Sequence, residues 1–160
     1  MYIHEDSRFC PEGWETHKTF CYQLSDKKRS FNDAKTECEQ KNAHLFTVQT
    51  EEDVNFWHKE VDLKKIDSAW IGLTWNENMR RWNWMNGKPT TIDSAPSRNR
   101  CPMFAKSGPV LNAVLTAAAM INPSWSKLSM ITKMAITGGE PCETKHHYYC
   151  QSYGKFPFNI

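Results

Sequence analysis

Six cysteines constrain this chain more than any other feature of its sequence. They stand at positions 10, 21, 38, 101, 142 and 150, and their even number lets every thiol find a partner. No two of them form a Cys-x-x-Cys pair, so neither a zinc ribbon nor a thioredoxin-like redox site is indicated. Because disulfides persist in oxidising compartments, we expect an extracellular domain with three internal disulfides.

The length and composition of the chain fit one folded domain. With 160 residues, of which 39% are hydrophobic and 12% aromatic, the chain can bury a single core. Its first ten residues carry acids and a histidine in place of the apolar stretch of a cleavable signal, which suggests a trimmed ectodomain or mature form. The longest mostly apolar stretch, Val110 to Ile121, is about half of the ~20 residues that a membrane span needs.

Two capping patterns predict two helices in the first half of the chain. Ser30, with Asp33 three positions later, predicts the start of a helix that ends near Lys41. Thr50, with Asp53 three positions later, predicts the start of a second helix. Apolar residues follow both caps at helical spacing, so each helix has one face for the core.

Short strands follow the helices. The sequence predicts them over Ala69 to Trp75, Arg81 to Met85, Cys101 to Phe104 and His147 to Gln151, and Asn86-Gly87 is a strong turn signal. The tryptophans at positions 70, 82 and 84 fall within these strands and are expected in the core. The order of the elements indicates an α+β fold with short antiparallel sheets.

The spacing of the cysteines favours one of the several connectivities that six cysteines allow. The first two cysteines flank a segment long enough to close a hairpin. Cys38 lies on a predicted helix and Cys150 on the last predicted strand, so pairing them would tie the start of the domain to its end. Cys101 and Cys142 would then pair with each other.

An ordered set of motifs resembles the C-type lectin-like domains. The motifs are Cys10-Pro11-Glu12-Gly13-Trp14, Phe20-Cys21-Tyr22, the helix with Ala34 and Cys38, Ala43-His44-Leu45, Trp70-Ile71-Gly72-Leu73, Trp82-Asn83-Trp84 with Asn86-Gly87, Cys101, and Tyr148-Tyr149-Cys150. The resemblance covers Cys10 to Cys150. It implies two helices packed on short antiparallel sheets and the disulfides Cys10–Cys21, Cys38–Cys150 and Cys101–Cys142, of which the first marks the long form of the fold.

The chain departs from the calcium-binding pattern of sugar-binding members of that family. Those members have Glu-Pro-Asn or Gln-Pro-Asp in the long loop and Trp-Asn-Asp on a later strand, and neither motif occurs here. Calcium prefers six to eight oxygen ligands, several of them carboxylates. The loop between Trp84 and Cys101 has one acid, Asp93, beside Arg98 and Arg100. We therefore expect no calcium at that site and no cofactor, as the resemblance to the calcium-independent natural-killer-receptor type also implies.

Forty residues separate Cys101 from Cys142, which predicts an insertion at about 108–139 within a domain that spans 10–151. Residues 1–9 would then form an N-terminal arm and 152–160 a C-terminal tail. Helical spacing of apolar residues on both sides of Asn122-Pro123 predicts two helices in the insertion. Trp125 is a candidate anchor for a partner or for self-association, although covering the core explains the apolar faces better.

Basic residues mark the candidate ligand-binding face. Between Asn78 and Lys106 the chain has six basic residues and one acid, and the net charge of +2 gives no reason to expect nucleic acid. Guanidinium groups suit carboxylate, sulfate or phosphate on a partner. A solvated loop with scattered charge explains the same pattern equally well. The candidate ligand-binding residues are Arg80, Arg81, Lys88, Arg98, Arg100 and Trp125.

The sequence thus favours an extracellular recognition module that binds a protein or other anionic partner without calcium, and a homodimer is a further candidate assembly. One alternative is a calcium-dependent carbohydrate-binding lectin with ligands from unfamiliar positions: Glu77, Asn78, Asp93 and Glu140. Another is a structural module of a larger receptor. His146-His147 is interpreted as structural, because Glu143 is the one carboxylate near it in sequence and both neighbouring thiols would be in disulfides. No motif indicates an enzyme.

Overall fold

A computed structural model describes residues 10–90, 95–96, 98–105 and 139–153. Asp93, Trp125 and almost all of the predicted insertion lie outside these residues. The described elements are β1 (Glu15–His17), β2 (Phe20–Leu24), α1 (Phe31–Gln40), β3 (His44–Leu45), α2 (Glu51–Leu63), β4 (Ser68–Trp70), β5 (Leu73–Asn76), β6 (Arg81–Trp84), β7 (Arg100–Cys101), β8 (Met103–Ala105), β9 (Glu140–Pro141) and β10 (His147–Tyr153). Among them, no helix is long and apolar enough to cross a membrane.

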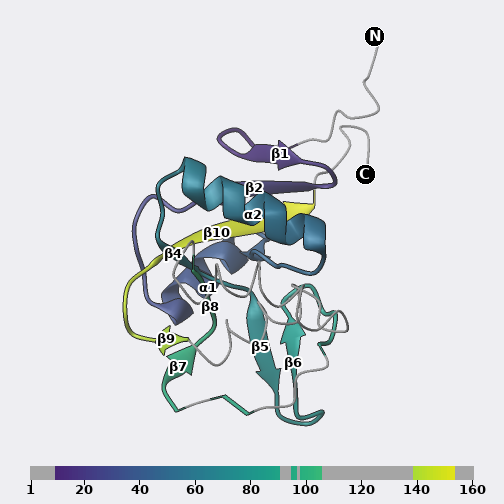
Figure 1. Cartoon of the computed structure of the whole chain (residues 1–160), viewed down its shortest axis with the longest axis vertical. Helices are drawn as coiled ribbons and strands as arrows, with labels where there is room; N and C mark the ends of the chain where they lie inside the picture. Colours follow the sequence, from purple (N-terminus) through teal and green to yellow (C-terminus); the bar gives the residue numbers. More distant parts are fainter. Residues whose placement is uncertain (1–9, 91–94, 97, 106–138, 154–160) are drawn as a thin grey trace, which may run out of the picture.

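The last strand, β10, lies at the centre of the main sheet. It pairs antiparallel with β2 and β3, and the sheet has the order β1-β2-β10-β4-β8 with β3 beside β10 (Figure 1). A hairpin of β5 and β6 and a short pair of β7 and β9 form two smaller sheets. The predicted α+β class is confirmed, but β10 pairs with β4 in parallel, so the expectation of purely antiparallel pairing is wrong at that point.

Alternate side chains of β10 pack against the two helices, which lie on opposite faces of the sheet. Tyr149 packs with Trp57 of α2, whereas Tyr148 and Cys150 belong to the cluster around α1. This alternation follows from the period of two along a strand. In Figure 1, α2 crosses in front of β2 and β10, and α1 lies behind them. The core therefore has two halves with the main sheet between them.

Both helices begin at the predicted caps. Thr50 Oγ1 accepts a hydrogen bond from Asp53 N, and the Asp53 carboxylate accepts one from Thr50 N in return, which completes a capping box. At α1, Ser30 Oγ accepts from Asp33 N at 3.4 Å, and the described hydrogen bonds include no return bond. The first helix therefore has half of the predicted reciprocal cap.

The three disulfides join the pairs that the resemblance implied. Cys10 is bonded to Cys21, Cys38 to Cys150 and Cys101 to Cys142. The second disulfide links α1 to β10 and closes a loop with a sequence separation of 112 residues. The third links β7 to the residue after β9 and so encloses the segment with the predicted insertion.

Two predicted strands are each divided into two shorter elements that belong to different sheets. The strand expected over 69–75 is divided between β4 and β5, which belong to different sheets, with Gly72 at the break. The strand expected over 101–104 is divided at Pro102, which has no N–H to donate. These two breaks direct β5 and β7 away from the main sheet.

A buried carboxylate connects α2 to the sheet. Glu60 is 6% exposed and accepts hydrogen bonds from the hydroxyls of Tyr22, at 3.4 Å, and Tyr149, at 3.1 Å. Lys64 Nζ lies 2.7 Å from the same carboxylate. Burial, with the nearby carboxylate, raises the pKa of both tyrosines, so their hydroxyls stay protonated as donors. The charge of Glu60 is thus compensated as burial requires.

Candidate functional site

The β5–β6 hairpin presents two of the predicted ligand-binding residues at its tip. Asn76 pairs with Arg81 across the hairpin, and Asn76 Oδ1 accepts a hydrogen bond from Met79 N at 3.1 Å, which closes the turn. Arg80 adopts a positive φ of 52° within this turn. Both arginines are exposed, and Met79 is 66% exposed beside them.

Arg80 is held in place by an aromatic ring and a carboxylate. Trp75 Nε1 donates to Glu77 Oε2 at 2.7 Å, and Arg80 Nη1 donates to Glu77 Oε1 at 3.1 Å. The guanidinium carbon of Arg80 lies 5.5 Å from the centroid of the Trp75 ring, within the range of a cation–π contact. These contacts order the side chain before any partner arrives. An ordered arginine loses less rotamer freedom on binding.

The other predicted basic residues lie elsewhere on the surface. Lys88 follows the turn at the far end of β6, where Gly87 has a φ of +94° and Lys88 N donates to Asn86 Oδ1. Arg98 precedes β7, and Arg100 Nη1 donates to the carbonyl of Gly139 at 2.8 Å. In Figure 1, β7 and the β5–β6 hairpin are separate branches of the lower half. The structure brings Arg80 and Arg81 together, and Arg98 near Arg100, but forms no single cluster of the five.

The carboxylates proposed as alternative calcium ligands are also dispersed. Glu77 lies at the hairpin tip and Glu140 in β9, whose partner is β7. Each already faces a cation, since Glu77 is bonded to Arg80 and Glu140 lies 3.9 Å from Arg100. Within the part of the chain that the structure describes, no three His, Cys, Asp or Glu side chains come close enough to hold a metal ion.

The adjacent histidines lie at the start of β10, the central strand of the main sheet. His146 Nδ1 lies 3.1 Å from Ser68 Oγ, and its ring meets Trp70 edge-on at 4.9 Å. The carboxylate near its Nε2, at 3.8 Å, is Glu140, so naming Glu143 as the one candidate was wrong. Glu140 is further than Glu143 from His146 in the sequence, but the pairing of β9 with β7 brings Glu140 close to the imidazole. Burial lowers the pKa of both imidazoles against the weaker effect of Glu140 on His146, which favours their neutral forms.

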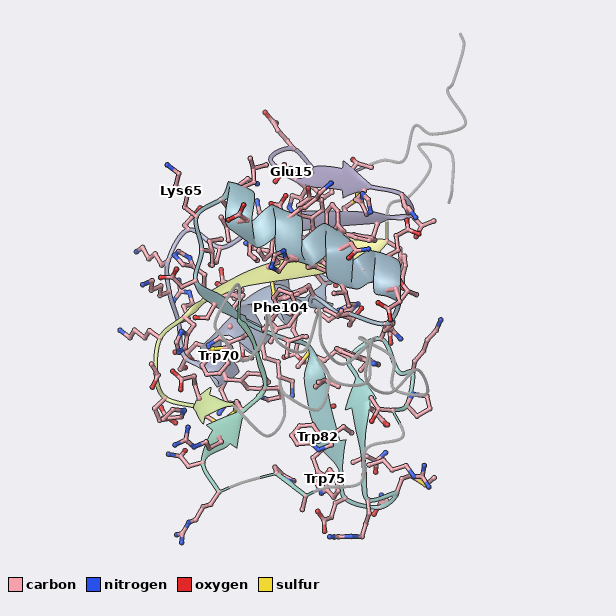
Figure 2. The ribbon with its side chains drawn as sticks, in the orientation of Figure 1. Glu15, Lys65, Trp70, Trp75, Trp82 and Phe104 are labelled. Carbon is pink, nitrogen blue, oxygen red and sulfur yellow. A yellow bond between two sulfur atoms is a disulfide. The ribbon has the colours of Figure 1, made fainter. Side chains whose placement is uncertain are left out.

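Sequence reasoning did not identify Trp75 or Met79 as part of a site. Trp75 was expected within a strand, and it does lie in β5, but it is only partly buried and its indole orients Glu77. The polar run Asn76-Glu77-Asn78 between two tryptophans was the available signal for an exposed turn. In Figure 2, Trp75 and Trp82 lie together at the lower end of the molecule, remote from Lys65.

Comparison with known proteins gives one family. The family model for the Lectin C-type domain matches residues 27–152. Killer cell lectin-like receptor subfamily B member 1B allele B of Mus musculus is 30% identical over 84 residues, which are 52% of this chain and 37% of the receptor. C-type lectin domain family 4 member A of Homo sapiens is 29% identical over 50% of this chain and 33% of its own length. The chain thus spans about a third of the length of these relatives.

Solved structures give the same fold at lower identity. The Ca²⁺-independent C-type lectin SPL-2 from Saxidomus purpuratus has a TM-score of 0.60 and 22% identity, and the match covers 94% of this chain and 97% of that one. The mouse scavenger receptor C-type lectin carbohydrate-recognition domain has a TM-score of 0.59 and 21% identity, covering 92% and 98% of the two chains. At such identities the likeness concerns the fold alone.

Proposed function

Because this chain belongs to the C-type lectin domain family, we propose that it is the ligand-recognition domain of a cell-surface or secreted protein and binds an anionic protein partner without calcium. The relatives include killer cell lectin-like receptors, which supports a receptor-type role. That the partner is anionic and that binding is independent of metal is inferred from the residues of the β5–β6 hairpin tip and of the β7–β9 pair.

The state of Glu77 carries the proposal. Both of its carboxylate oxygens are engaged, one by the Trp75 indole and the other by the Arg80 guanidinium. A carboxylate paired with an arginine has its charge compensated, which makes it a poorer ligand for a calcium ion that must be neutralised locally. Glu140 makes only longer contacts, at 3.9 Å from Arg100 and 3.8 Å from His146. Each of these two acids thus lies beside an arginine, and the remaining arginines leave the hairpin tip and the β7–β9 pair electropositive.

The hairpin tip has the composition of a protein-binding surface. Exposed Met79 supplies apolar area beside Arg80 and Arg81, and methionine and arginine are both enriched in protein interfaces. Two adjacent guanidinium groups can each form a forked pair with a partner carboxylate. Arg98 and Arg100, on the β7 branch, extend the positive field and would favour encounter with an acidic surface. Trp125, outside the described residues, stays a prediction.

The test is a screen of the 160-residue chain against an array of extracellular protein domains, with and without a calcium chelator. A partner identified in this way is then titrated against Arg80→Gln/Arg81→Gln and against Arg98→Gln/Arg100→Gln. We expect each pair to lower the affinity about tenfold at low salt, with a smaller loss at high salt because screening weakens surface charge. The chelator should leave the affinity unchanged.

Lys59→Gln/Lys65→Gln is the matched control. Both lysines are exposed, and Lys65 lies at the opposite end of the molecule from Trp75 (Figure 2), so this variant removes the same charge without touching the hairpin. An equal loss of affinity in the control would mean that the net charge of the chain, and not the position of the arginines, determines the affinity. Binding to a defined sugar that the chelator abolishes would replace the proposal with a calcium-dependent lectin.

A further inference from the structure

The disulfides leave one interval between Cys10 and Cys150 outside every closed loop. Cys10–Cys21 closes a first loop, and Cys38–Cys150 closes a second that contains the third disulfide. A backbone cut inside either loop leaves the two pieces joined by a disulfide. A cut between Cys21 and Cys38 has no such bridge. Hydrolysis of one peptide bond within residues 22–37 therefore divides the domain into two covalently separate pieces.

A loop of residues 26–28 lies within that interval, in the connection between β2 and α1, and all three residues are exposed. Backbone hydrogen bonds hold the loop at its two ends. Ser25 N donates to the carbonyl of Tyr148 at 2.8 Å, and Arg29 N donates to that of His146 at 2.9 Å. Between these ends, the described backbone hydrogen bonds include none from residues 26–28. Exposed loops of this kind are where proteases cut folded domains, because little structure has to open first.

The side chains of the loop fit one class of protease. Lys27 and Lys28 are exposed, and a protease with an acidic residue at the base of its specificity pocket cleaves after Lys or Arg. Arg29 is half-buried, and its carbonyl, which belongs to the bond after it, accepts from His146 N at 2.9 Å. Lys35, the other basic residue of the interval, lies within α1, whose backbone is hydrogen-bonded. The accessible bonds are therefore those after the two lysines.

We propose that the loop of residues 26–28 is a cleavage site for serine proteases of trypsin-like specificity, and that one cut there leaves the N-terminal piece attached by noncovalent contacts alone. The reaction is hydrolysis. The bond from the carbonyl carbon of Lys27 or Lys28 to the next nitrogen breaks, a water oxygen bonds to that carbon, and a proton goes to the released amine. The larger piece carries α1, α2 and the β5–β6 hairpin. The proposal does not depend on what the hairpin tip binds.

The contacts that would hold the N-terminal piece are those of β1 and β2. Strand β2 pairs with β10 at five positions, and Phe20 and Tyr22 are buried in the core. The ring of His17 in β1 stacks on Phe56 of α2 at a centroid distance of 3.7 Å. After a cut, the lifetime of the attachment depends on how often β2 leaves the sheet. A protease would thus convert a permanent link within the domain into a reversible one.

The experiment treats the folded, non-reduced 160-residue chain with trypsin and follows the products by mass spectrometry. We expect a fragment that ends at Lys27 or Lys28 to separate in denaturant without reductant, and to stay with the larger piece under native conditions. Its rate of formation should be within about a hundredfold of that in the reduced, unfolded chain, because a bond exposed only by global unfolding is slowed by more than about a thousandfold. A slower cut, or dissociation under native conditions, would overturn the proposal.

Variants then locate the cut. Lys27→Gln/Lys28→Gln removes both side chains that the specificity pocket needs, so separation without reductant should be abolished. Lys59→Gln/Lys65→Gln removes the same charge from exposed positions on and after α2, and should leave the rate unchanged. A cut after Arg80 lies inside the second disulfide loop, so its pieces should separate only when reductant is added. Continued separation of the Lys27→Gln/Lys28→Gln chain without reductant would place the cut elsewhere and contradict the site.

Discussion

Replacing Gly72 by alanine should displace the β5–β6 hairpin from the rest of the domain. Gly72 stands between β4 and β5, where its N–H donates to the carbonyl of Phe46 at 2.8 Å and its carbonyl accepts from Met85 N at 2.8 Å. A Cβ added at this position would lie 2.3 Å from the carbonyl oxygen of Leu45 and 3.1 Å from that of Phe46. At Gly72 the chain therefore packs against β3 backbone to backbone, and no space is left for a side chain.

The magnitude follows from which atoms would have to move. Carbon and oxygen atoms approach to roughly 3.3 Å even in close contacts, so the overlap with the Leu45 oxygen is about 1 Å. That oxygen belongs to β3, which is paired with β10, and it has no rotamer with which to escape. Overpacking a core costs about 1–3 kcal/mol when side chains can adjust. Adding the weakening of two backbone hydrogen bonds at about 1 kcal/mol each, we expect a loss of about 4 kcal/mol in the free energy of unfolding.

Urea unfolding followed by tryptophan fluorescence measures that loss, and hydrogen exchange locates it. The amides of β5 and β6 should lose protection before those of β10. Gly87→Ala is the matched control, because Gly87 has a φ of +94° but no atom within 4 Å of the added Cβ. Its cost is then backbone strain alone, about 1–2 kcal/mol. If Gly72→Ala lost less than Gly87→Ala, the close approach to Leu45 would not be what positions the hairpin.

Two other perturbations report on the scaffold. Replacing Cys38 and Cys150 by alanine should lower the free energy of unfolding by about 5 kcal/mol, against about 3 kcal/mol for Cys10 and Cys21. The difference follows from chain entropy, because the closed loops span 112 and 11 residues. Equal losses in calorimetry would contradict this reasoning. As pH falls below about 6.5, the unfolded chain takes up a proton before the folded chain does, because the pKa of His44 is lowered on folding, so stability should decrease on acidification. His44→Gln should flatten this dependence of the melting temperature, though not remove it, since the pKa values of three other histidines are lowered too; an unchanged slope would rule out His44 as a contributor.

The parts of the fold that local chemistry determines could be predicted from the sequence. The starts of α1 and α2 were visible because Ser30 and Thr50 act on residues three positions away. The buried tryptophans 70, 82 and 84 were visible because the strand period places them on inner faces. In each case the signal and its structural effect lie within a few residues of each other.

The features that depend on distant segments could not be predicted. Nothing near Gly72 in the sequence shows that the backbone of Leu45 passes beside it, so the strand was expected to continue. The parallel pairing of β4 with β10 joins segments almost eighty residues apart. The contact of Glu140 with His146 likewise depends on the β7–β9 pair. The excess of basic residues between Asn78 and Lys106 was visible in the sequence, but their separation into one group on the hairpin and another near β7 was not.

The side chains of β6 divide between the core and the surface. Trp82 and Trp84 face the core, so Arg81 and Asn83 share the outer face of the strand, about 7 Å apart by the rise of two residues. Arg81 belongs to the proposed protein-binding tip, so the position of this tip depends on how β6 is held. Met85, which follows β6, donates its N–H to the carbonyl of Gly72, and the close contact of Gly72 with Leu45 therefore fixes the hairpin on which the tip stands.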